Sequence, residues 1–508
     1  GDLSAFENVD NIGIALFVEL RPHRESNFRD AGAVVISGIF PFGETARLVA
    51  DVLQRPRNVA GNQLGTFSLA AMWMSSWIGG ASIVGTATDG YDLGISGGWY
   101  VFILAIGTFL FGMTFTKLVK RLGAKLKDIT YPALITSRYD NRTGILVIVC
   151  TFLAGIGFLA SQLVALASML ATMTGWDVFT CFIIGTVVTV AYSAIGGILA
   201  ITYTTWVQFI LIILGTVVLG IPLSAKAMGG FGGVSALPSE WFDLGRYGPA
   251  TIIALGVSSV FSFYTSMDSY QRSFAAKSPR IAKNGTLWAA LSIVFIAFGA
   301  TYMGMSAKVL IPELPEGTSA YAALVMTYFP SGISGLVLVG VFAAIMSTGV
   351  VSINCCAANV SVDIYRDRVN PKAKDSTVKL LAVISSLVAG IVGAVLAWWQ
   401  YDIVSLLLLA FTFQAASLFF PTVFGMFWKK PTAKAAFVSI IISMAVVLVW
   451  LICSALDVAP IFETDALWPG LVSSFLSFMA LTLFGKPTPE DQRKAELFCS
   501  IAAEKSAD

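Results

Sequence analysis

Long apolar runs separated by short charged segments make up most of the chain after residue 65. A helix needs about 20 apolar residues to cross a hydrocarbon core of about 30 Å. Inside lipid every backbone polar group must be bonded within the protein, so each run is predicted to be a helix. The pattern predicts membrane spans near residues 66–88, 96–119, 145–174, 177–196, 198–222, 250–267, 283–309, 333–362, 377–399, 403–428, 435–456 and 465–485.

The loops between these spans alternate in charge. More than half of the 32 Lys and Arg residues lie in the loops that follow the second, sixth, eighth and tenth spans. The intervening loops are acidic or neutral, with Glu313, Glu316, Asp402 and Asp457 among their charges. Because basic loops stay in the cytoplasm, the pattern predicts a multi-pass protein of the plasma (inner) membrane with a cytoplasmic C-terminal tail.

The N-terminal segment, residues 1–65, follows the pattern less closely. Residues 31–54 are long enough to span the bilayer but contain Glu44, Arg47 and Asp51, and charges inside a membrane are costly and rare. Glu44 and Arg47 lie one helical turn apart and could form an ion pair. An additional span and a peripheral amphipathic helix explain this segment equally well.

Composition agrees with lipid as the main solvent. Hydrophobic residues make up 56% of the chain and charged residues 12%, whereas soluble proteins carry about 25% charged residues. The net charge of +2 offers no surface for nucleic acid. The single histidine, His23, and the lack of paired acidic residues within the spans leave little material for a catalytic centre. We therefore expect a membrane protein that is not an enzyme.

The first span contains the segment Ser75-Ser76-Trp77-Ile78-Gly79-Gly80-Ala81-Ser82. Each glycine inside a helix costs about 1 kcal/mol relative to alanine, so the Gly79-Gly80 pair favours a break. Unwound backbone in mid-membrane is tolerated where it lines a cavity, and its free carbonyls can then bind a cation. Close helix packing through small residues explains the same pair equally well.

The sixth span is short and rich in hydroxyl groups between Ser258 and Asp268. It occupies the position in the second half of the chain that the interrupted first span occupies in the first half. Weak segments at corresponding positions are a sequence indication of a transporter binding site. Five spans in residues 66–222 and five in residues 250–428 would form two repeats of inverted orientation, because five is an odd number.

The eighth span contains Ala344, Ser347 and Thr348, which share one helical face. One carbonyl and two hydroxyl groups form a set of neutral oxygens suited to a small monovalent cation. If Ser75 and Ile78 contribute their carbonyls, five oxygens converge. The alternative is that the two hydroxyls only bond back to the preceding turn of their own helix.

Four stretches of the chain resemble the sodium:solute symporter family, which includes proline, pantothenate, sugar, sialic-acid and choline carriers. Together with Trp77-Ile78-Gly79-Gly80 and Gly85-Thr86, which are most similar to the choline-carrier branch, they cover residues 66–430 in the family's order and spacing. They are Tyr192-Ser193-Ala194-Ile195-Gly196-Gly197 running on to Gln208, Asp268-Ser269-Tyr270-Gln271-Arg272, Ala343-Ala344-Ile345-Met346-Ser347-Thr348 ending at Asp363-Ile364-Tyr365, and Gly425-Met426-Phe427-Trp428-Lys429-Lys430.

The resemblance implies an all-α polytopic membrane protein with the leucine-transporter-like 5+5 inverted repeat and extra terminal helices. It implies one Na+ held by Ser75, Ile78, Ala344, Ser347 and Thr348, the set that the residues themselves suggest. The family's substrate positions fall on Ala81, Ser82, Phe158, Gln162, Ser259, Phe263 and Gln414. For Gln162 and Gln414, a hydrogen bond to a neighbouring helix is an equally good explanation.

The expected organisation is an N-terminal segment (1–65), a transport core (66–428), two peripheral spans (429–485) and a tail (486–508). The expected function is sodium-coupled symport of a small organic solute by alternating access. Many family members carry an acid in the fifth helix where this chain has Thr205, which favours one sodium per cycle. Alternatives are a proton-coupled carrier, a substrate sensor of transporter-like fold and, less favoured, a passive channel. The solute (amino acid, carboxylate, quaternary amine or sugar) and the oligomeric state stay open.

Overall fold

The computed structural model describes residues 64–126, 130–315, 317–399 and 403–504, apart from the side chains of 195–206, 404 and 405. The expectations for the N-terminal segment and for Thr205 therefore fall outside the described part. Within it, the regular secondary structure is helical, apart from one isolated bridge between Leu64 and Ala276. The fold is thus the all-α membrane class that the apolar runs predict.

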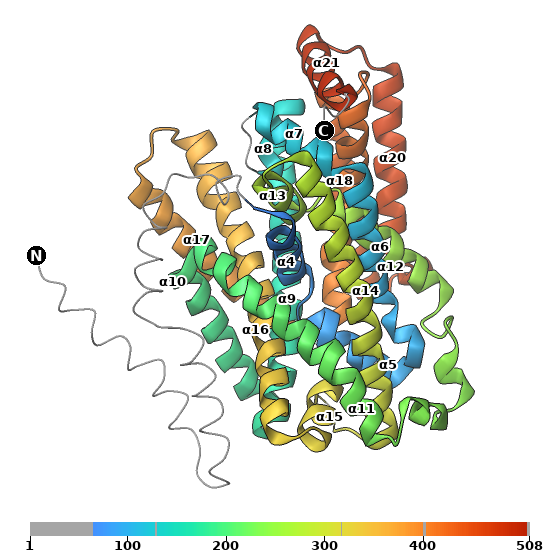
Figure 1. Ribbon diagram of the computed structural model, residues 1–508. Helices are drawn as coiled ribbons and strands as arrows, with labels where there is room; N and C mark the ends of the chain where they lie inside the picture. The colour runs from blue at the N-terminus through green and yellow to red at the C-terminus, as the bar shows by residue number, and fades with distance from the viewer. Residues whose placement is uncertain (1–63, 127–129, 316, 400–402, 505–508) are drawn as a thin grey trace, which may run out of the picture.

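The helices follow the expected spans closely, and Figure 1 shows them as one bundle. In chain order they are α4 (Thr66–Trp77), η2 (Ala81–Gly85), α5 (Thr86–Leu93), η3 (Gly94–Gly98), α6 (Trp99–Thr114), α7 (Thr116–Leu126), α8 (Tyr131–Arg138), α9 (Asn141–Thr174), α10 (Val178–Ile212), η4 (Ile213–Gly220), α11 (Ile221–Ala227), η5 (Phe231–Ala236), η6 (Ser239–Phe242), α12 (Pro249–Phe263) and α13 (Met267–Ala275). They continue with α14 (Pro279–Leu310), α15 (Ala320–Tyr328), α16 (Ser331–Ala358), η7 (Asn359–Val369), α17 (Asp375–Trp399), α18 (Ile403–Phe427), α19 (Ala433–Ala455), η8 (Pro460–Glu463), α20 (Leu467–Phe484) and α21 (Pro489–Ala503).

Within the described ranges, nine helices are long and apolar enough to cross a membrane, or ten if the bent pair α12–α13 is one span. Two expected spans are not among these. The first is divided at Ile78, so that α4 has only 12 residues. The other corresponds to the shorter apolar stretch Val178–Ala194, which belongs to α10. The expected boundary between the fourth and fifth spans falls on residues 195–206, whose side chains are not described.

Helix α4 lies in the middle of the bundle, against α10, α13, α14 and α16 (Figure 1). Its nine residues from Leu69 to Trp77 are all buried. Helices α16 and α18 both pack along α9, while the exposed faces of α17 and α19 carry large apolar side chains suited to lipid. The broken helix is therefore surrounded by protein, which is where unwound backbone survives in a membrane.

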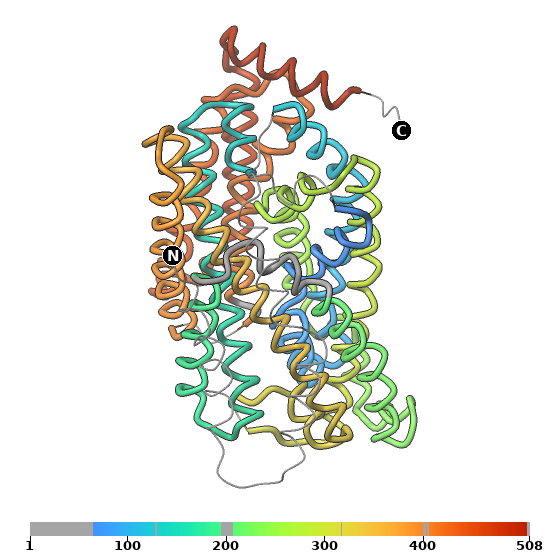
Figure 2. The backbone as a smooth tube through the Cα atoms, turned by 60° about the vertical axis from the view of Figure 1, so that its left-hand side comes forward, coloured from blue at the N-terminus to red at the C-terminus, as the bar shows by residue number. Residues whose placement is uncertain are grey.

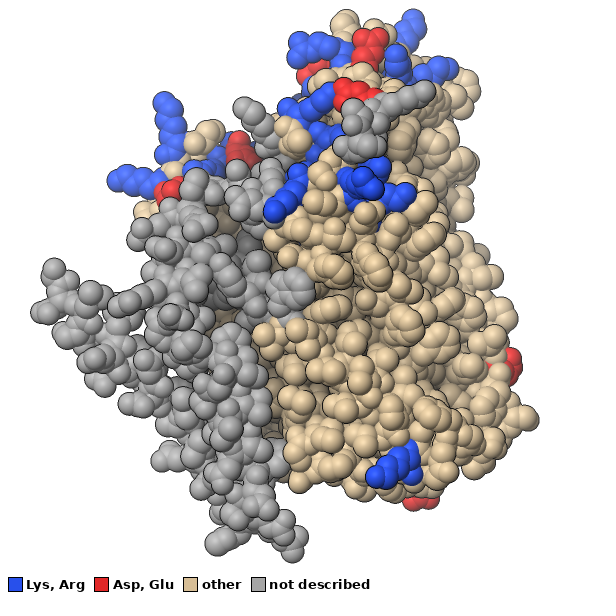
Figure 3. Space-filling view, viewed as in Figure 1, with Lys and Arg blue, Asp and Glu red and all other residues tan. Residues whose placement is uncertain are grey.

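Charged side chains are unevenly distributed between the two ends of the bundle. Figure 3 shows Lys and Arg concentrated at the end that carries α7, α8 and α21, at the top of the view. We call this end the basic face. Figure 2 shows α21 lying across it rather than along the bundle. Phe498 and Ile501 of α21 are buried, and Lys494 Nζ donates a hydrogen bond of 2.7 Å to the carbonyl of Tyr139.

Candidate ion and solute site

The break in the first span lies at Ile78 and Gly79. Helix α4 ends at Trp77, and Ile78 adopts an extended conformation with φ −102° and ψ 93°. The Ile78 N–H still donates to Met74 O at 2.9 Å, and helical structure resumes at Gly80. Extended backbone at Ile78 turns peptide groups away from the helix axis, so carbonyls near the end of α4 lose their intrahelical partners. Those carbonyls become available to other ligands.

Two hydroxyl groups of α16 lie against the end of α4. Thr348 Oγ1 donates to Ser75 O at 3.1 Å and to Ala344 O at 3.0 Å. Ser347 Oγ is 3.4 Å from Ser75 O and 2.9 Å from Ala344 O. The structure thus brings four of the five expected ion-binding residues into hydrogen-bond contact, and all four are buried. We call these oxygens, with the Ile78 carbonyl expected beside them, the oxygen cage.

The spacing of these oxygens suits a cation of the size of Na+. Oxygen ligands stand about 2.3–2.6 Å from a hard cation of similar size, Ca2+, so neighbouring ligands lie about 3.4 Å apart. Rotation of the two hydroxyl protons away from the cage would turn both donors into cation ligands. No group of three or more His, Cys, Asp or Glu side chains that could hold a metal occurs in the described part of the chain. The cage therefore favours a monovalent ion over a transition metal.

Gly79 allows the break to approach α16 and α9 closely. A Cβ atom at this position would lie 2.4 Å from Gln162 Oε1 and 2.6 Å from Thr348 Oγ1. Atoms at these distances overlap, so only glycine fits without displacing a neighbour. Gly79 thus also allows the broken backbone to contact α16, the helix that carries Ser347 and Thr348.

Gln162 of α9 bonds to the restarting helix. Its Oε1 accepts a hydrogen bond of 2.7 Å from the N–H of Gly80, and its Nε2 donates to Ser161 Oγ at 3.0 Å. The first N–H groups of a helix have no intrahelical acceptor, so Gln162 supplies one. In this structure the Gln162 side chain bonds to a neighbouring helix and stabilises the break. That bond is the alternative to a substrate contact for this residue.

We expect Gln162→Met to lower transport about tenfold at unchanged protein level. Methionine has a similar length but no acceptor, and leaving a buried N–H unpaired costs about 1–3 kcal/mol. Gln162→Glu keeps an oxygen for Gly80 and serves as the control, with a loss of less than about threefold. Equal losses in the two variants, measured as initial uptake rates in proteoliposomes, would contradict the role of this hydrogen bond.

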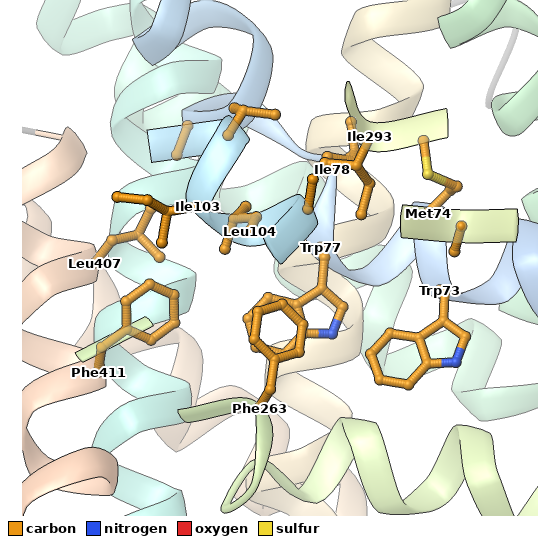
Figure 4. Close-up of a cluster of buried hydrophobic side chains, with 14 of the residues drawn as sticks. Trp73, Met74, Trp77, Ile78, Ile103, Leu104, Phe263, Ile293, Leu407 and Phe411 are labelled. Carbon is orange, nitrogen blue, oxygen red and sulfur yellow. The ribbon is translucent and has the colours of Figure 1, made fainter. Parts of the chain in front are cut away.

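A cluster of aromatic rings lies beside the break. Trp77 stacks on Phe263 of α12 with ring centroids 4.0 Å apart, and it meets Phe158 of α9 edge-on at 5.7 Å. Phe411 of α18 contacts both Trp77 and Phe158. Figure 4 shows Trp77 and Phe263 face to face, with Phe411 to one side. Rings from four helices thus close the space next to the cage.

A small cavity, with about 50 Å3 of space for the centres of water-sized molecules, adjoins this cluster. It lies between α4, α9, α16, α18 and the α12–α13 bend. Trp77 and Phe158 contribute rings to it, and Gln414 contributes an amide. The remaining lining residues are Ser76, Thr151, Ala154, Gly155, Ser266, Met267, Asp268, Val351, Ser352 and Cys355. Apolar and aromatic groups are mixed on this lining with hydroxyl, carboxylate and amide groups, so the cavity offers a small solute both apolar and polar contacts.

The seven expected substrate residues lie in different places in the structure. Phe158 and Gln414 line the cavity, and Phe263 stacks on Trp77. Ala81 and Ser82 are buried in η2, where Ser82 Oγ donates to Trp77 O at 2.8 Å. Ser259 is fully buried, and its Oγ has no hydrogen-bond partner among the described residues. Gln162 lies at the break, where its Oε1 accepts the hydrogen bond from the Gly80 N–H.

Sequence reasoning missed several polar residues of the cavity, notably Ser76, Ser266 and Ser352. Asp268 was noted only as the end of the hydroxyl-rich stretch of the sixth span and as part of a family motif. Ser352 lies one turn beyond Thr348 on α16, so the helical period that selects Ser347 and Thr348 could have extended the polar face to it. Ser266 and Asp268 reach the cavity because the chain bends by 43° between α12 and α13, which no local pattern specifies.

The chain is similar to a known family and to several of its members. Residues 58–443 match the family described as the sodium:solute symporter family. The sodium/pantothenate symporter of Escherichia coli (strain K12) is 24% identical over 479 residues, which cover 90% of this chain and 96% of that protein. The high-affinity proline transporter PutP of Bacillus subtilis (strain 168) is 24% identical and covers 89% and 95%. The sodium/glucose cotransporter of Vibrio parahaemolyticus is 23% identical and covers 76% and 77%.

A solved structure shares the fold. The outward-open, substrate-bound Na+-coupled sialic acid symporter superposes with a TM-score of 0.68 at 20% identity, covering 85% of this chain and 92% of that one. At this level of identity the likeness concerns the arrangement of helices. It agrees with a core of repeated, partly broken helices around a central site.

Proposed function

The chain belongs to the sodium:solute symporter family, and from this premise we propose that one sodium ion in the oxygen cage drives each cycle of solute uptake. The protein is an integral, multi-pass membrane protein that couples sodium to the transport of a small organic solute. It is not an enzyme. The observation that carries the proposal is the contact of Ser347 and Thr348 with the Ser75 carbonyl at the break.

The proposed mechanism depends on the two helices that the ion would join, α4 and α16. Sodium in the cage would replace hydrogen bonds between α4 and α16 with stronger ion–oxygen contacts, and it would hold the two helices together. The same segment of α4 carries Trp77, whose ring forms part of the cavity wall and of the aromatic cluster. Binding of the ion therefore fixes one wall of the solute site. Separation of α4 from α16 would weaken the cage and release the ion.

One sodium ion supplies enough free energy for accumulation. Its movement across 100 mV yields about 2.3 kcal/mol, and a tenfold concentration gradient adds about 1.4 kcal/mol. With tight coupling, the total of about 3.7 kcal/mol sustains a solute ratio of a few hundred. A second ion is not required energetically.

We propose that the basic face lies in the cytoplasm, because basic loops remain on that side of the plasma membrane. Helix α21 lies across this face, so the C-terminal tail would be cytoplasmic. The proposed units are the core of residues 66–428, the peripheral spans within 429–485 and this tail.

For the solute, we propose an amino acid or another carboxylate. Two of the relatives described above are named for proline and pantothenate, and a third for glucose. The indole Nε1 of Trp77 is buried and has no hydrogen-bond partner among the described residues. This donor could bond a solute oxygen at the cavity wall. A quaternary amine against the rings of Trp77 and Phe158 and a sugar are the alternatives.

A solute panel tests the proposal directly. Purified protein in proteoliposomes is offered amino acids, carboxylates, quaternary amines and sugars, with an inward gradient of sodium or of potassium. We expect one class to accumulate at least tenfold above equilibrium in sodium, and replacement of sodium by potassium to abolish accumulation. Equal accumulation in potassium, or accumulation driven by a pH gradient alone, would contradict sodium coupling.

A further inference from the structure

The cavity and the oxygen cage are lined by neighbouring residues of the same two helices, α4 and α16. Ser76, which follows the cage residue Ser75, lines the cavity. On α16, Ser352 also lines the cavity, and its Oγ donates to the carbonyl of the cage residue Thr348 at 3.1 Å. An ion that leaves the cage between α4 and α16 would therefore enter the cavity past these two hydroxyl groups.

Asp268 is the one charged residue on the described lining of this cavity. It lies in the first turn of α13, and only 8% of its surface is exposed. Arg272 Nη2 is 2.7 Å from Oδ1, while Oδ2 has no hydrogen-bond partner among the described residues. Buried carboxylate oxygens normally accept hydrogen bonds, so a buried oxygen without a donor, on the lining of a polar cavity, indicates a place for a cation.

Arg272 approaches the carboxylate from outside the cavity lining. Besides its ion pair with Asp268, it donates from Nε to Ser76 Oγ at 3.3 Å. The guanidinium therefore joins α13 to the segment of α4 next to the cage. It also neutralises part of the attraction that Asp268 would exert on a cation, because the two positive charges would compete for one carboxylate.

We propose that the Asp268 carboxylate is a second, transient binding position for a monovalent cation, which receives sodium from the oxygen cage before the ion leaves the protein. This inference rests on the proposed function of the cage. Sodium occupies the two positions in succession, so the stoichiometry of one ion per cycle is unchanged. Competition from Arg272 keeps binding at Asp268 weak, which suits an ion that must dissociate.

Three variants of the full-length protein separate this role from a structural one. Asp268→Asn removes the charge that would attract the ion. Arg272→Gln leaves the carboxylate without its competitor. The double variant D268N/R272Q removes both charges, so it contains no unpaired buried charge and remains informative if a single variant fails to fold. Glu490→Gln, which removes the exposed carboxylate of the i,i+4 pair with Lys494 on α21, is the matched control.

Net uptake and counterflow distinguish ion release from the other steps. Net sodium-driven uptake requires sodium to leave the inner side, whereas solute counterflow with high sodium on both sides does not. We expect D268N and D268N/R272Q to slow net uptake about tenfold while counterflow changes less than twofold. In R272Q we expect internal sodium to inhibit net uptake at about tenfold lower concentration. E490Q should match the wild type in all assays.

A purely structural ion pair predicts different results. Both single variants would then lose net uptake and counterflow together, and the double variant would recover both. Either that pattern or normal net uptake in D268N/R272Q would overturn the proposal.

Equilibrium binding of radioactive sodium, without solute, separates failure of this inference from failure of the cage. We expect S347A/T348A/R272Q to retain weak sodium binding and S347A/T348A/D268N to lose it. Equal binding in these two variants would overturn the Asp268 position and leave the cage proposal untouched. Sodium binding unaffected by S347A/T348A alone would contradict the cage instead.

Discussion

Replacement of both Ser347 and Thr348 by alanine is expected to raise the sodium concentration for half-maximal uptake about 100-fold. The variant removes two of the oxygens that meet at the cage and leaves the carbonyls of Ser75 and Ala344. Hydrogen bonds and ligands at charged groups contribute about 1.5–3 kcal/mol each, so the loss of two corresponds to at least 100-fold in affinity. Uptake measured against external sodium in proteoliposomes gives this shift directly.

The control for this variant lies on the same helical stretch. Ser334 and Ser361 are buried, and their hydroxyls bond back to the carbonyls of Ser331 and Ala357. The double variant S334A/S361A therefore removes two hydroxyls of the same kind away from the cage, and its sodium dependence should stay within twofold of the wild type. An unchanged sodium dependence of S347A/T348A would refute the site. Sodium-dependent thermal stabilisation gives a second readout, because an ion that binds the native state raises its melting temperature.

Gly79→Ala is expected to reduce transport to about 1% of the wild-type rate. The added methyl group would lie 2.4 Å from Gln162 Oε1, 2.6 Å from Thr348 Oγ1 and 2.9 Å from Thr348 Cβ. These neighbours belong to α9 and α16, which pack tightly against each other. Overpacking of this kind costs about 1–3 kcal/mol, and relief requires the break to move away from α16. That movement would separate the Ser75 carbonyl from both hydroxyls.

Gly332→Ala provides the matched control for this substitution. Gly332 lies in the first turn of α16, and a Cβ there would meet nothing within 4 Å. We expect G332A to transport within twofold of the wild type and to show the same sodium dependence. Size-exclusion profiles and melting temperatures in detergent establish that both variants are folded. Wild-type sodium affinity in a folded G79A variant would show that the close approach at Gly79 is not needed for the cage.

Much of the fold could be predicted from the sequence because the lipid bilayer strongly constrains the conformation of the backbone. Apolar runs of the length of a bilayer have no alternative to helix, so α9, α14, α17, α19 and α20 lie close to the expected residues. For the first span, two adjacent glycines weaken a helix locally, but a break and close helix packing explained the pair equally well, and the structure shows the break at Ile78. The expected boundary between the fourth and fifth spans does not interrupt α10, which runs from Val178 to Ile212 through a stretch that is continuously apolar apart from small and hydroxyl-bearing residues.

The candidate site, like the fold, could be predicted only in part. Ala344, Ser347 and Thr348 could be selected because residues three and four positions apart share a helical face. Trp77 and Phe263, by contrast, meet only because α4 and α12 are both interrupted at the same depth of the bundle. The partners of Gln162 and Arg272 lie 82 and 196 positions away along the chain. Periodicity within one helix contains no information about such pairs.

The sequence by itself determined that this protein is a helical membrane transporter with a Gly79-Gly80 pair in its first span and a hydroxyl-bearing face on its eighth. Those properties depend on local length, hydrophobicity and helical period. The tertiary structure alone decided that the Ser75 carbonyl meets Ser347 and Thr348, that Gln162 bonds the Gly80 N–H, and that Asp268 reaches a cavity beside the cage. The physical reason is that packing between helices, which depends on side-chain shape across the whole bundle, sets which groups come within bonding distance.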